Sequence, residues 1–317
     1  MTFKIGLVGL CTSHPEAWLP IIRQLAADGR VDVEVVAAWD SGETRPANFA
    51  EEFGRKNHLP AAVDCLENMV ELVDGVIIHA CNWDRHLEYV TRFAAAGKSI
   101  LLDKPLAGNM AQLNRLAEMM KTGARICGGS SLRFAPELLA LREQPEAERG
   151  ALHTAYMALG VDDFNYAIHG YAAFCGLFGG GIRSVRYLGG NARKHLMLTW
   201  HTGQTAFFEF GPSAWLPFKM TVTSATGVFQ LNLTRFYETF LEKNLPYLAR
   251  QTEMPPLTIA DLMVPELAAL AARQSWQNHG QEVFLSDLRS DDPGYDGTQF
   301  ATEYRRARLP DSVPAAK

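Results

Sequence analysis

Several features that mark large protein classes are missing from this sequence. No apolar run approaches the ~20 residues that a membrane-spanning helix requires. The net charge is −5, so no basic excess is available to bind nucleic acid or an anionic membrane. The five cysteines form no C-x-x-C pair, which argues against a disulfide framework or structural zinc and favours a reducing cytoplasm.

The two ends of the sequence give separate expectations. Residues 1–9 are apolar but short and lack a basic region and a cleavage site, so we expect a first buried strand there. Arg305, Arg306 and Arg308 cluster near the other end. We expect a solvated terminal segment there, followed by a frayed tail over 310–317.

What the sequence does contain is a chain of 317 residues, long enough for two domains. Up to about residue 130, short apolar runs alternate with amphipathic stretches, a pattern typical of βαβ units on a parallel sheet. We therefore predict a Rossmann-type dinucleotide-binding domain over residues 1–129. The predicted strands lie at 3–9, 33–39, 61–63, 74–79, 99–102 and 125–127, and the helices at 15–28, 45–53, 84–96 and 110–121.

The pattern changes after residue 130. Stretches such as 205–210 and 219–223 alternate apolar and polar residues between turn formers, which predicts antiparallel strands. Helices are predicted near 234–243 and 259–278. Residues 130–317 should therefore form an α+β domain on a largely antiparallel open sheet, which binds the substrate.

The first predicted loop departs from the fingerprint G-x-G-x-x-G, in which bare backbone approaches the pyrophosphate at a helix N-terminus. Gly9 supplies the first glycine, but Cys11 and His14 stand where the other two would be. Ser13 and Glu16 have the spacing of a capping box, so we expect Ser13 to cap the helix. His14 has two interpretations: it faces a ligand in the crevice, or it only belongs to this cap.

Asp40 ends the second predicted strand, about where an acidic residue binds the adenosine ribose in NAD-specific folds. No arginine follows at once, which favours NAD over NADP. The alternative is that Asp40 only opens a turn with Ser41 and Gly42.

Short motifs in a fixed order extend along almost the whole chain. They are Asn82 with His86, the run Ala94-x-x-Gly97-Lys98, the run Asp103-Lys104-Pro105-x-Ala107, the run Arg133-Phe134-x-Pro136, and Asn165 with His169. Together they resemble the Gfo/Idh/MocA family, named for glucose–fructose oxidoreductase and inositol dehydrogenase. Aspartate in place of glutamate before the lysine is one departure from the family pattern.

The resemblance implies a nicotinamide-dependent oxidoreductase that acts on a sugar, polyol or related hydroxylated small molecule. It implies that Lys104 contacts the reacting oxygen and that His169 exchanges its proton. These roles suit an ammonium group and an imidazole at neutral pH. It also implies a cis Lys104–Pro105 bond and a homo-oligomer, a dimer or tetramer, formed through the open face of the second sheet.

The candidate site residues follow from these motifs. Catalysis is expected from Lys104, His169 and Asn165. The substrate is expected to contact Lys104, Arg133, Asp163, Asn165 and His169. NAD is expected to contact Gly9, Cys11, Thr12, Ser13, His14, Asp40, Asn82, His86 and Lys104. No metal ligand is expected.

Two departures keep other functions open. The later glycines of the first loop are missing, and Asn165 stands where the family has an aspartate, so no carboxylate can orient an imidazolium there. A lyase, hydratase or glycoside-cleaving enzyme on the same scaffold, with bound or lost NAD, is one alternative. A non-catalytic sugar or dinucleotide sensor is another. Lys104 and His169 also have ordinary interpretations, as a solvated lysine and a packed core histidine.

Two further sets of residues have weaker signals. A metal site without recognised ligand spacing could be drawn from His153, Asp162, Asp163, His169, His195 and His201. A sugar ring could stack on Trp83, Trp200 or Trp215, each of which is equally suited to packing in a core or an interface.

Overall fold

The computed structural model describes residues 1–309 and begins with the predicted parallel sheet. Its six strands lie in the order β3-β2-β1-β4-β5-β6, and every neighbouring pair is parallel. Strand order reverses at β1, and such a reversal marks the crevice where α/β sheets bind ligands. The strands are β1 (Phe3–Val8), β2 (Val33–Trp39), β3 (Ala61–Ala62), β4 (Gly75–Ile78), β5 (Ser99–Asp103) and β6 (Ile126–Gly129).

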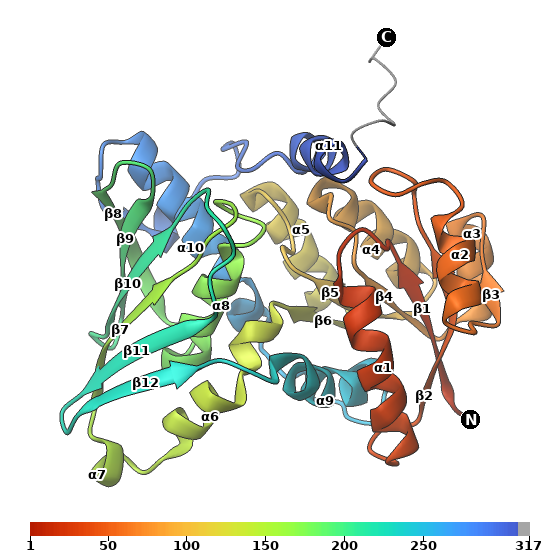
Figure 1. Ribbon diagram of the computed structural model, residues 1–317, viewed down its shortest axis with the longest axis horizontal. Helices are drawn as coiled ribbons and strands as arrows, with labels where there is room; N and C mark the ends of the chain where they lie inside the picture. Colours follow the sequence, from red (N-terminus) through yellow and green to blue (C-terminus); the bar gives the residue numbers. More distant parts are fainter. Residues whose placement is uncertain (310–317) are drawn as a thin grey trace.

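Helices cover both faces of this sheet (Figure 1). Ile77 packs with residues of α1 (His14–Ala27) and α9 (Phe236–Leu248). Val76 and Ile78 pack on the opposite face, with α4 (His86–Ala95) and α5 (Met110–Lys121). This double burial is the reason that β4 is a continuous apolar run.

Two short helices lie at the β2–β3 edge, and they differ from the sequence prediction. α2 (Phe49–Lys56) begins later than the helix predicted at 45–53, because Pro46 and the N-cap Asn48 precede it. α3 (Leu66–Leu72) is not among the predicted helices, and at two turns it is too short to give a clear periodicity.

The second sheet has seven strands in the order β12-β11-β7-β10-β9-β8-β13, and its neighbouring pairs are antiparallel except for β7 and β10. Phe208 faces the core, whereas its neighbour Phe207 is 40% exposed on the open face, as the alternation along a half-buried strand requires. The predicted α/β class with an α+β second half is therefore confirmed. The strands are β7 (Leu152–Ala158), β8 (Ile182–Gly189), β9 (Lys194–Trp200), β10 (Thr205–Phe210), β11 (Lys219–Ser224), β12 (Val228–Asn232) and β13 (Val283–Phe284).

The buried face of the second sheet packs against α8 (Ile168–Phe178) and α10 (Ile259–Gln277). α8 is buried along nearly its whole length, which accounts for its apolar sequence. The connection from β6 to β7 runs through η2 (Ser131–Phe134), α6 (Pro136–Glu143) and α7 (Glu146–Arg149). The remaining one-turn elements are η1 (Trp83–Arg85) and η3 (Leu285–Asp287).

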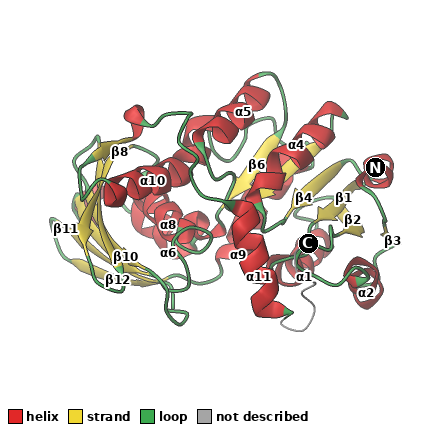
Figure 2. Cartoon of the chain, turned by 90° about the horizontal axis from the view of Figure 1, so that it is seen from above, coloured by secondary structure: helices red, strands yellow, loops and turns green. Residues whose placement is uncertain are grey.

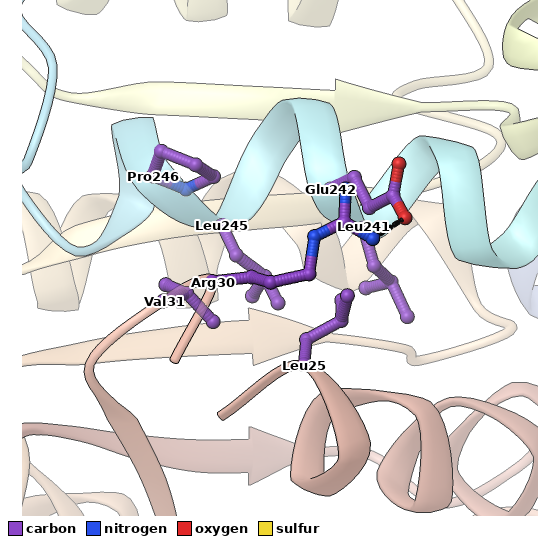
Figure 3. Close-up of a pocket in the computed structure, with 7 residues that line it drawn as sticks. All are labelled: Leu25, Arg30, Val31, Leu241, Glu242, Leu245 and Pro246. Atoms are coloured by element: carbon purple, nitrogen blue, oxygen red, sulfur yellow. Dashed lines mark hydrogen bonds and ion pairs between the residues drawn. The ribbon is translucent and has the colours of Figure 1, made fainter. Parts of the chain in front are cut away.

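α9 ties the two sheets together, because it follows the second sheet in sequence but packs on α1. Figure 3 shows the end of this contact, where Arg30 pairs with Glu242 beside Leu25, Leu241 and Leu245. The cavity there holds about 70 Å³, well below the size of metabolite pockets, so the contact is structural.

The last described helix, α11 (Gly297–Arg308), returns to the first domain and is absent from the sequence prediction. It lies across the loops that follow β1 and β4 (Figure 2). Arg305 and Arg308 donate hydrogen bonds to carbonyls of the first domain. The expectation of a solvated terminal segment is therefore wrong for these two arginines.

The predicted tail, 310–317, lies outside the described residues. Within residues 1–309, no helix is long and apolar enough to cross a membrane.

Candidate active site

A cavity of about 400 Å³ lies at the carboxyl edge of the first sheet, where that sheet faces α8 and α9. Its polar lining comes from both domains, and aromatic rings form much of the remaining wall. This position, at the switch point of a parallel sheet, is the usual place of a ligand site in such folds. The lining residues are Thr12, Ser13, His14, Lys104, Val161, Asp162, Asn165, Tyr166, His169, Phe218, Phe236, Tyr237, Phe300 and Tyr304.

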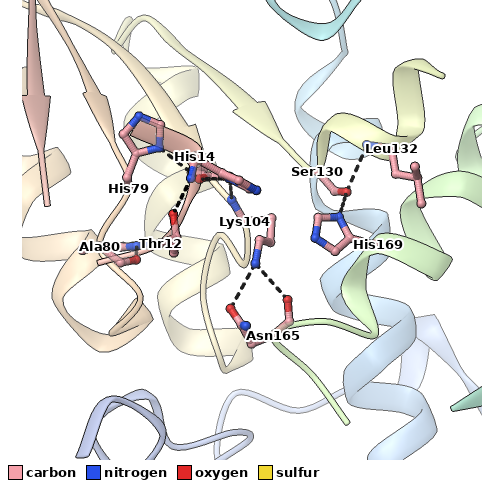
Figure 4. A network of polar contacts seen from close by, with 11 residues as sticks. Thr12, His14, His79, Ala80, Lys104, Ser130, Leu132, Asn165 and His169 are labelled. Carbon is pink, nitrogen blue, oxygen red and sulfur yellow. Dashed lines mark hydrogen bonds and ion pairs between the residues drawn. The ribbon is translucent and has the colours of Figure 1, made fainter. Parts of the chain in front are cut away.

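Lys104 enters this cavity from the end of β5. The Lys104–Pro105 peptide bond is cis, and the side chain is nearly buried. Its Nζ donates to the backbone oxygen and to Oδ1 of Asn165, each at 3.1 Å (Figure 4). Burial lowers the pKa of Lys104, and the negative charges of Asp103 and Asp162 oppose that shift. The ammonium group is thus fixed at the cavity wall by an uncharged partner.

His169 lies in the first turn of α8 on the same cavity. Its Nδ1 is 2.8 Å from Ser130 Oγ, and no carboxylate stands behind the ring. Burial, followed by the positive charge of Lys104, holds the pKa of His169 well below its usual range. The ring is therefore neutral at physiological pH.

A buried carboxylate lies beneath Lys104. Asp103 Oδ2 is 2.5 Å from His14 Nδ1 and 3.1 Å from His79 Nδ1, and its Oδ1 accepts the Lys104 N–H at 2.8 Å. Burial alone would raise the pKa of Asp103, but the two histidines outweigh it and hold the pKa well below its usual range. Asp103 therefore stays ionised and links the first loop to the lysine.

Of three other charged residues considered from the sequence, one lines the cavity and two lie outside its lining. Asp162 lines the cavity, where its Oδ1 accepts the backbone N–H groups of Phe164 and Tyr166. Asp163, next in sequence, lies outside the cavity lining and pairs with Lys194. Arg133 also lies outside the lining, where it donates to the backbone oxygen of Asp261 at the start of α10.

The loop after β1 keeps one feature of a dinucleotide site. Gly9 has φ +79°, and a Cβ there would lie 2.8 Å from the backbone of Ala80. Only glycine allows this close approach between the β1 and β4 loops. Asp40 accepts the N–H of Leu10 at 2.7 Å and that of Gly42 at 2.8 Å. Its carboxylate thus closes the turn after β2 and also holds the first loop.

α1 starts where the sequence predicts, but its N-cap hydrogen bonds differ from the prediction. Ser13 occupies the N-cap position of α1, but its side chain makes no capping hydrogen bond, so the predicted capping box is wrong. Thr12 takes over, because its Oγ1 accepts the His14 N–H at 3.2 Å. This leaves the side chain of Ser13 exposed at the cavity mouth.

The remaining predicted cofactor residues are buried beside the cavity and do not line it. Cys11 packs against Cys81 and Ala301. Asn82 caps η1 through the Asp84 N–H and donates to Glu43. The ring nitrogens of His86 lie against two carbonyls, Ala80 O at 2.7 Å and Leu106 O at 3.2 Å, so this histidine braces the loop that follows Lys104.

Whether the groove along this edge fits a dinucleotide depends on α11. Beneath the helix, Gly9 permits close approach to the backbone, and Asp40 follows β2 where a ribose would lie. In the position described, however, α11 packs on Cys11 and Cys81, and its Arg305 and Arg308 donate to carbonyls of the loops that follow β2 and β1. The residues of the groove fit the cofactor, and the helix above them does not leave it room.

Some site residues have no role among the sequence predictions. Asp103 ends β5 and His79 follows β4, and these two strands are parallel neighbours. That shared placement is the signal that could have identified both residues. The aromatic walls contributed by α9 and α11 carry no such signal, because long-range packing alone brings them to the cavity. These are Phe236, Tyr237, Phe300 and Tyr304.

One group among residues 1–309 has metal-ligand atoms close together: His14, His79 and Asp103, within 4.8 Å of one another. The second-domain residues considered from the sequence form no such group in that range. Two ligands bound at about 2.1 Å to a tetrahedral ion lie roughly 3.4 Å apart. The separations of 2.5 and 3.1 Å to Asp103 are those of hydrogen bonds.

Fold and cavity together define a two-domain α/β protein with a candidate ligand site at the switch point of a Rossmann sheet. Residues 3–128 match the Gfo/Idh/MocA model, described as an oxidoreductase family with an NAD-binding Rossmann fold. Residues 3–128 thus form an NAD-binding Rossmann domain of the Gfo/Idh/MocA type.

Curated relatives support the assignment over part of their length. The chain is 29% identical over 217 residues to a candidate oxidoreductase subunit of a UDP-kanosamine synthase from Amycolatopsis mediterranei, covering 68% of this chain and 53% of that protein. It is 26% identical over 144 residues to the inositol 2-dehydrogenase of Rhizobium meliloti, covering 45% and 40%. The match thus spans about half or less of these relatives' length.

Solved structures extend the likeness of fold to nearly the whole chain. The myo-inositol dehydrogenase of Lactobacillus casei, in complex with NAD(H) and myo-inositol, has a TM-score of 0.74 and covers 90% of this chain and 97% of its own. At 18% identity this likeness establishes the fold alone.

Proposed function

We propose that this protein is an NAD-dependent dehydrogenase for a sugar, polyol or related hydroxylated small molecule. One observation carries the proposal: an oriented lysine ammonium and two imidazoles, those of His14 and His169, meet at one cavity on the switch point of a Rossmann sheet. The family supports nicotinamide chemistry at that place. Relatives named for inositol support a polyol substrate.

Lys104 would bind the reacting oxygen. A lysine ammonium beside a hydroxyl stabilises the alkoxide charge that develops as hydride leaves the adjacent carbon. Asn165 holds two of the lysine's three protons, which leaves the third for the substrate. NAD, when bound, would accept the hydride. It would be held by the loop from Gly9 to His14 and by Asp40.

His169 would bind a neighbouring hydroxyl or exchange the proton. Its neutral ring, fixed by Ser130, can accept or donate a hydrogen bond from its free nitrogen. Tyr166 and Tyr237 offer aromatic faces for the apolar side of a sugar or cyclitol ring. Burial raises the pKa of Tyr166 to about 12, so its phenol stays protonated and can donate to a hydroxyl.

The test is NADH formation by the purified full-length chain with a panel of inositols, aldoses and nucleotide sugars, followed by absorbance. We expect turnover with NAD and slower turnover with NADP, because Asp40 disfavours a 2′-phosphate. Turnover of a substrate without any dinucleotide would contradict the proposal.

A second candidate function has a specific observation in its favour. α11 covers the loops where the cofactor would bind, and Asn165 stands where the family has an aspartate. Both features suit a lyase or hydratase, because such an enzyme does not need to bind and release free NAD. Such an enzyme would transform substrate in the same panel without net NADH formation, which chromatography of the products would reveal.

We also propose a homo-oligomer in a reducing compartment. Tyr156 and Phe207 are register partners on β7 and β10, and both are at least 40% exposed on the open face of the second sheet. An apolar pair at the centre of a sheet face is suited to burial against a second copy. All five cysteines are free, which supports the cytoplasm as location.

A further inference from the structure

The first loop contributes an imidazole backed by a buried carboxylate. His14 lines the cavity, and its Nδ1 lies 2.5 Å from Asp103 Oδ2. Trp18 stacks on the ring at 5.0 Å, and Tyr237 meets it edge-on at 5.3 Å. The ring is therefore fixed in position and orientation by groups from α1, β5 and α9.

This arrangement determines which nitrogen carries the proton. An ionised carboxylate can only accept, so His14 Nδ1 must donate to Asp103. In the neutral ring the lone pair then lies on Nε2, for which residues 1–309 provide no hydrogen-bond partner. His169 is different, because its Nδ1 faces the hydroxyl of Ser130 and no carboxylate supports its positive form. Of the two imidazoles at the cavity, His14 is the better proton acceptor.

We propose that His14 is the general base of the reaction and that Asp103 positions it, an inference that rests on the proposed function. The substrate hydroxyl would lose its proton to His14 Nε2, and its carbon would lose hydride to the nicotinamide. The C–O bond becomes a carbonyl, the substrate is oxidised by two electrons and NAD is reduced to NADH. In the reverse direction His14 returns the proton.

The charges around His14 are compatible with this role. The groups that face it from neighbouring elements are Asp103, Lys104, His79, His169 and Tyr237. Burial keeps the pKa of His79 below its ordinary value, and burial also lowers those of Lys104 and His169. Asp103 is the one of these groups that is negative at neutral pH, and it stabilises the imidazolium that His14 forms.

The test compares His14→Ala with His169→Ala, with and without added imidazole. We expect His14→Ala to lower kcat by about 100- to 10,000-fold and to recover activity with imidazole, because the cavity can admit the free base. His169→Ala should lower kcat by a smaller factor, and added imidazole should not restore its activity. Rescue of His169→Ala alone, or a loss of less than tenfold in His14→Ala, would overturn the assignment.

A second readout does not depend on turnover. Histidine-selective NMR of the full-length chain should show His14 as the Nδ1–H tautomer, with a downfield proton that is lost in Asp103→Asn. The Nε2–H tautomer would contradict the role of His14 even if the protein proves to be no dehydrogenase. Conversely, the expected tautomer without NADH formation on any substrate would place the failure in the proposed function alone.

A different observation, the path of α11, carries a second inference. The first turn of the helix is held by Asp84 of η1, whose Oδ2 accepts the N–H groups of Gly297 at 2.8 Å and Thr298 at 3.0 Å. It ends where Arg305 donates to Gly42 O at 2.7 Å and Arg308 donates to Cys11 O at 2.6 Å. Between them Ala301 is fully buried against Cys11 and Cys81.

This path coincides with the groove that a dinucleotide needs, from Asp40 over the Gly9 loop to Lys104. The helix and the cofactor cannot occupy it together. We infer that α11 is a strap that competes with the cofactor, an inference that also rests on the proposed function. Its last turn is held mainly by two partly exposed arginines on carbonyls, and contacts of that kind open locally at modest cost.

The test is NADH affinity, by fluorescence titration of the full-length chain and two variants. Arg305→Ala with Arg308→Ala should bind NADH about tenfold more tightly, because the strap loses three charge-assisted bonds to carbonyls of the first domain. Arg306→Ala removes an exposed arginine from the same turn and should leave the affinity unchanged. Hydrogen exchange of α11 should rise when NADH binds to the unaltered chain.

Three outcomes are distinguishable. Equal affinity in all proteins would overturn the strap but not the dehydrogenase. Weaker binding in the double variant would show that the arginines hold the cofactor, and would also overturn the strap. No NADH binding to any of the proteins would overturn both the strap and the proposed function.

Discussion

The two halves of the same sheet edge differ in how fully they resemble a dehydrogenase site. At the ends of β4 and β5, Asp103 and Lys104 form a connected polar network with His14, the first residue of α1, and this network opens into a cavity. At the β1–β2 half, Gly9 and Asp40 remain, but their hydrogen bonds serve the loops themselves and α11 covers them. The first half opens into a cavity, whereas α11 packs over the loops of the second half.

Under the proposed function, the substrate half and the cofactor half of the site have different structural requirements. The reacting groups depend on a few side chains at strand ends, which the sheet positions accurately. Cofactor binding depends on bare backbone and open space, which Cys11, His14 and a returning helix can each remove. Breaking each half in turn measures how far the two depend on each other.

The largest expected effect is at the catalytic half. Lys104→Met should lower kcat by about 100- to 1,000-fold, because it removes the positive charge beside the developing alkoxide. NADH affinity, measured by fluorescence, should change little. Lys121→Met, on the exposed face of α5, is the matched control and should keep full activity. A large loss of NADH affinity with intact kcat would assign Lys104 to the cofactor half instead.

The corresponding break at the cofactor half is Gly9→Ala. The new Cβ would lie 2.8 Å from the backbone of Ala80, at a φ of +79°. We expect a loss of about 2–4 kcal/mol in the free energy of unfolding, measured with denaturant. Gly97→Ala has a similar φ of +67° but meets nothing within 4 Å, so its loss should be nearer to about 1 kcal/mol. Equal losses would mean that the loops are not in close contact.

Stability should depend on pH through a residue that supports the catalytic half. Glu266 Oε1 accepts the N–H of Leu106 at 2.9 Å, while Oε2 is buried without a partner. Burial raises the pKa of Glu266 to about 7. Because this folded-state pKa exceeds the unfolded value, the contribution of Glu266 to stability is present at low pH and is lost as the pH rises to about 7.

Glu266→Gln removes this titration and keeps the acceptor for Leu106. The variant should be more stable than the unaltered chain at pH 8, by about 3 kcal/mol at most, with the difference vanishing towards pH 4. Denaturant unfolding at both pH values measures it. The exposed Glu118→Gln should show no such pattern, and a pH-independent difference in Glu266→Gln would exclude titration of this carboxyl group.

The smallest expected effect comes from Asn165→Asp, which restores the aspartate of the family pattern. Asn165→Asp places a carboxylate where Asn165 Oδ1 now lies 3.1 Å from Lys104 Nζ. An adjacent negative charge raises the pKa of a lysine, so the alkaline limb of the kcat/KM profile should move up by about one pH unit. Asn165→Ser, which adds no charge, should not move it upward. An unmoved limb in Asn165→Asp would mean that Lys104 does not control it.

How much of this could be predicted from the sequence differs between the two halves. The parallel strands and the placement of Lys104 follow from apolar runs that end in polar residues, so β4 and β5 were predictable with the residues that follow them. Asp103 and His79 were predictable in principle for the same reason. The strap was not, because the apolar face of α11 is only Phe300, Ala301 and Tyr304, and its partners are about 200 or more residues away.

The conformation of the loop after β1 also could not be predicted from local sequence patterns. The spacing of Ser13 and Glu16 predicted a capping box, but Thr12 caps the helix. His14 turns to the buried carboxylate of Asp103, a partner 89 residues away that no local motif identifies. Tertiary contact decided the conformation of this loop.

The most direct test of the central claim is a crystal structure of the full-length chain grown with NADH. The dinucleotide should extend from Asp40 past Gly9, with its nicotinamide ring beside Lys104 and His14, and α11 should have left Cys11 and Cys81. A structure at saturating NADH with α11 still on these cysteines and no dinucleotide in the groove would contradict the claim.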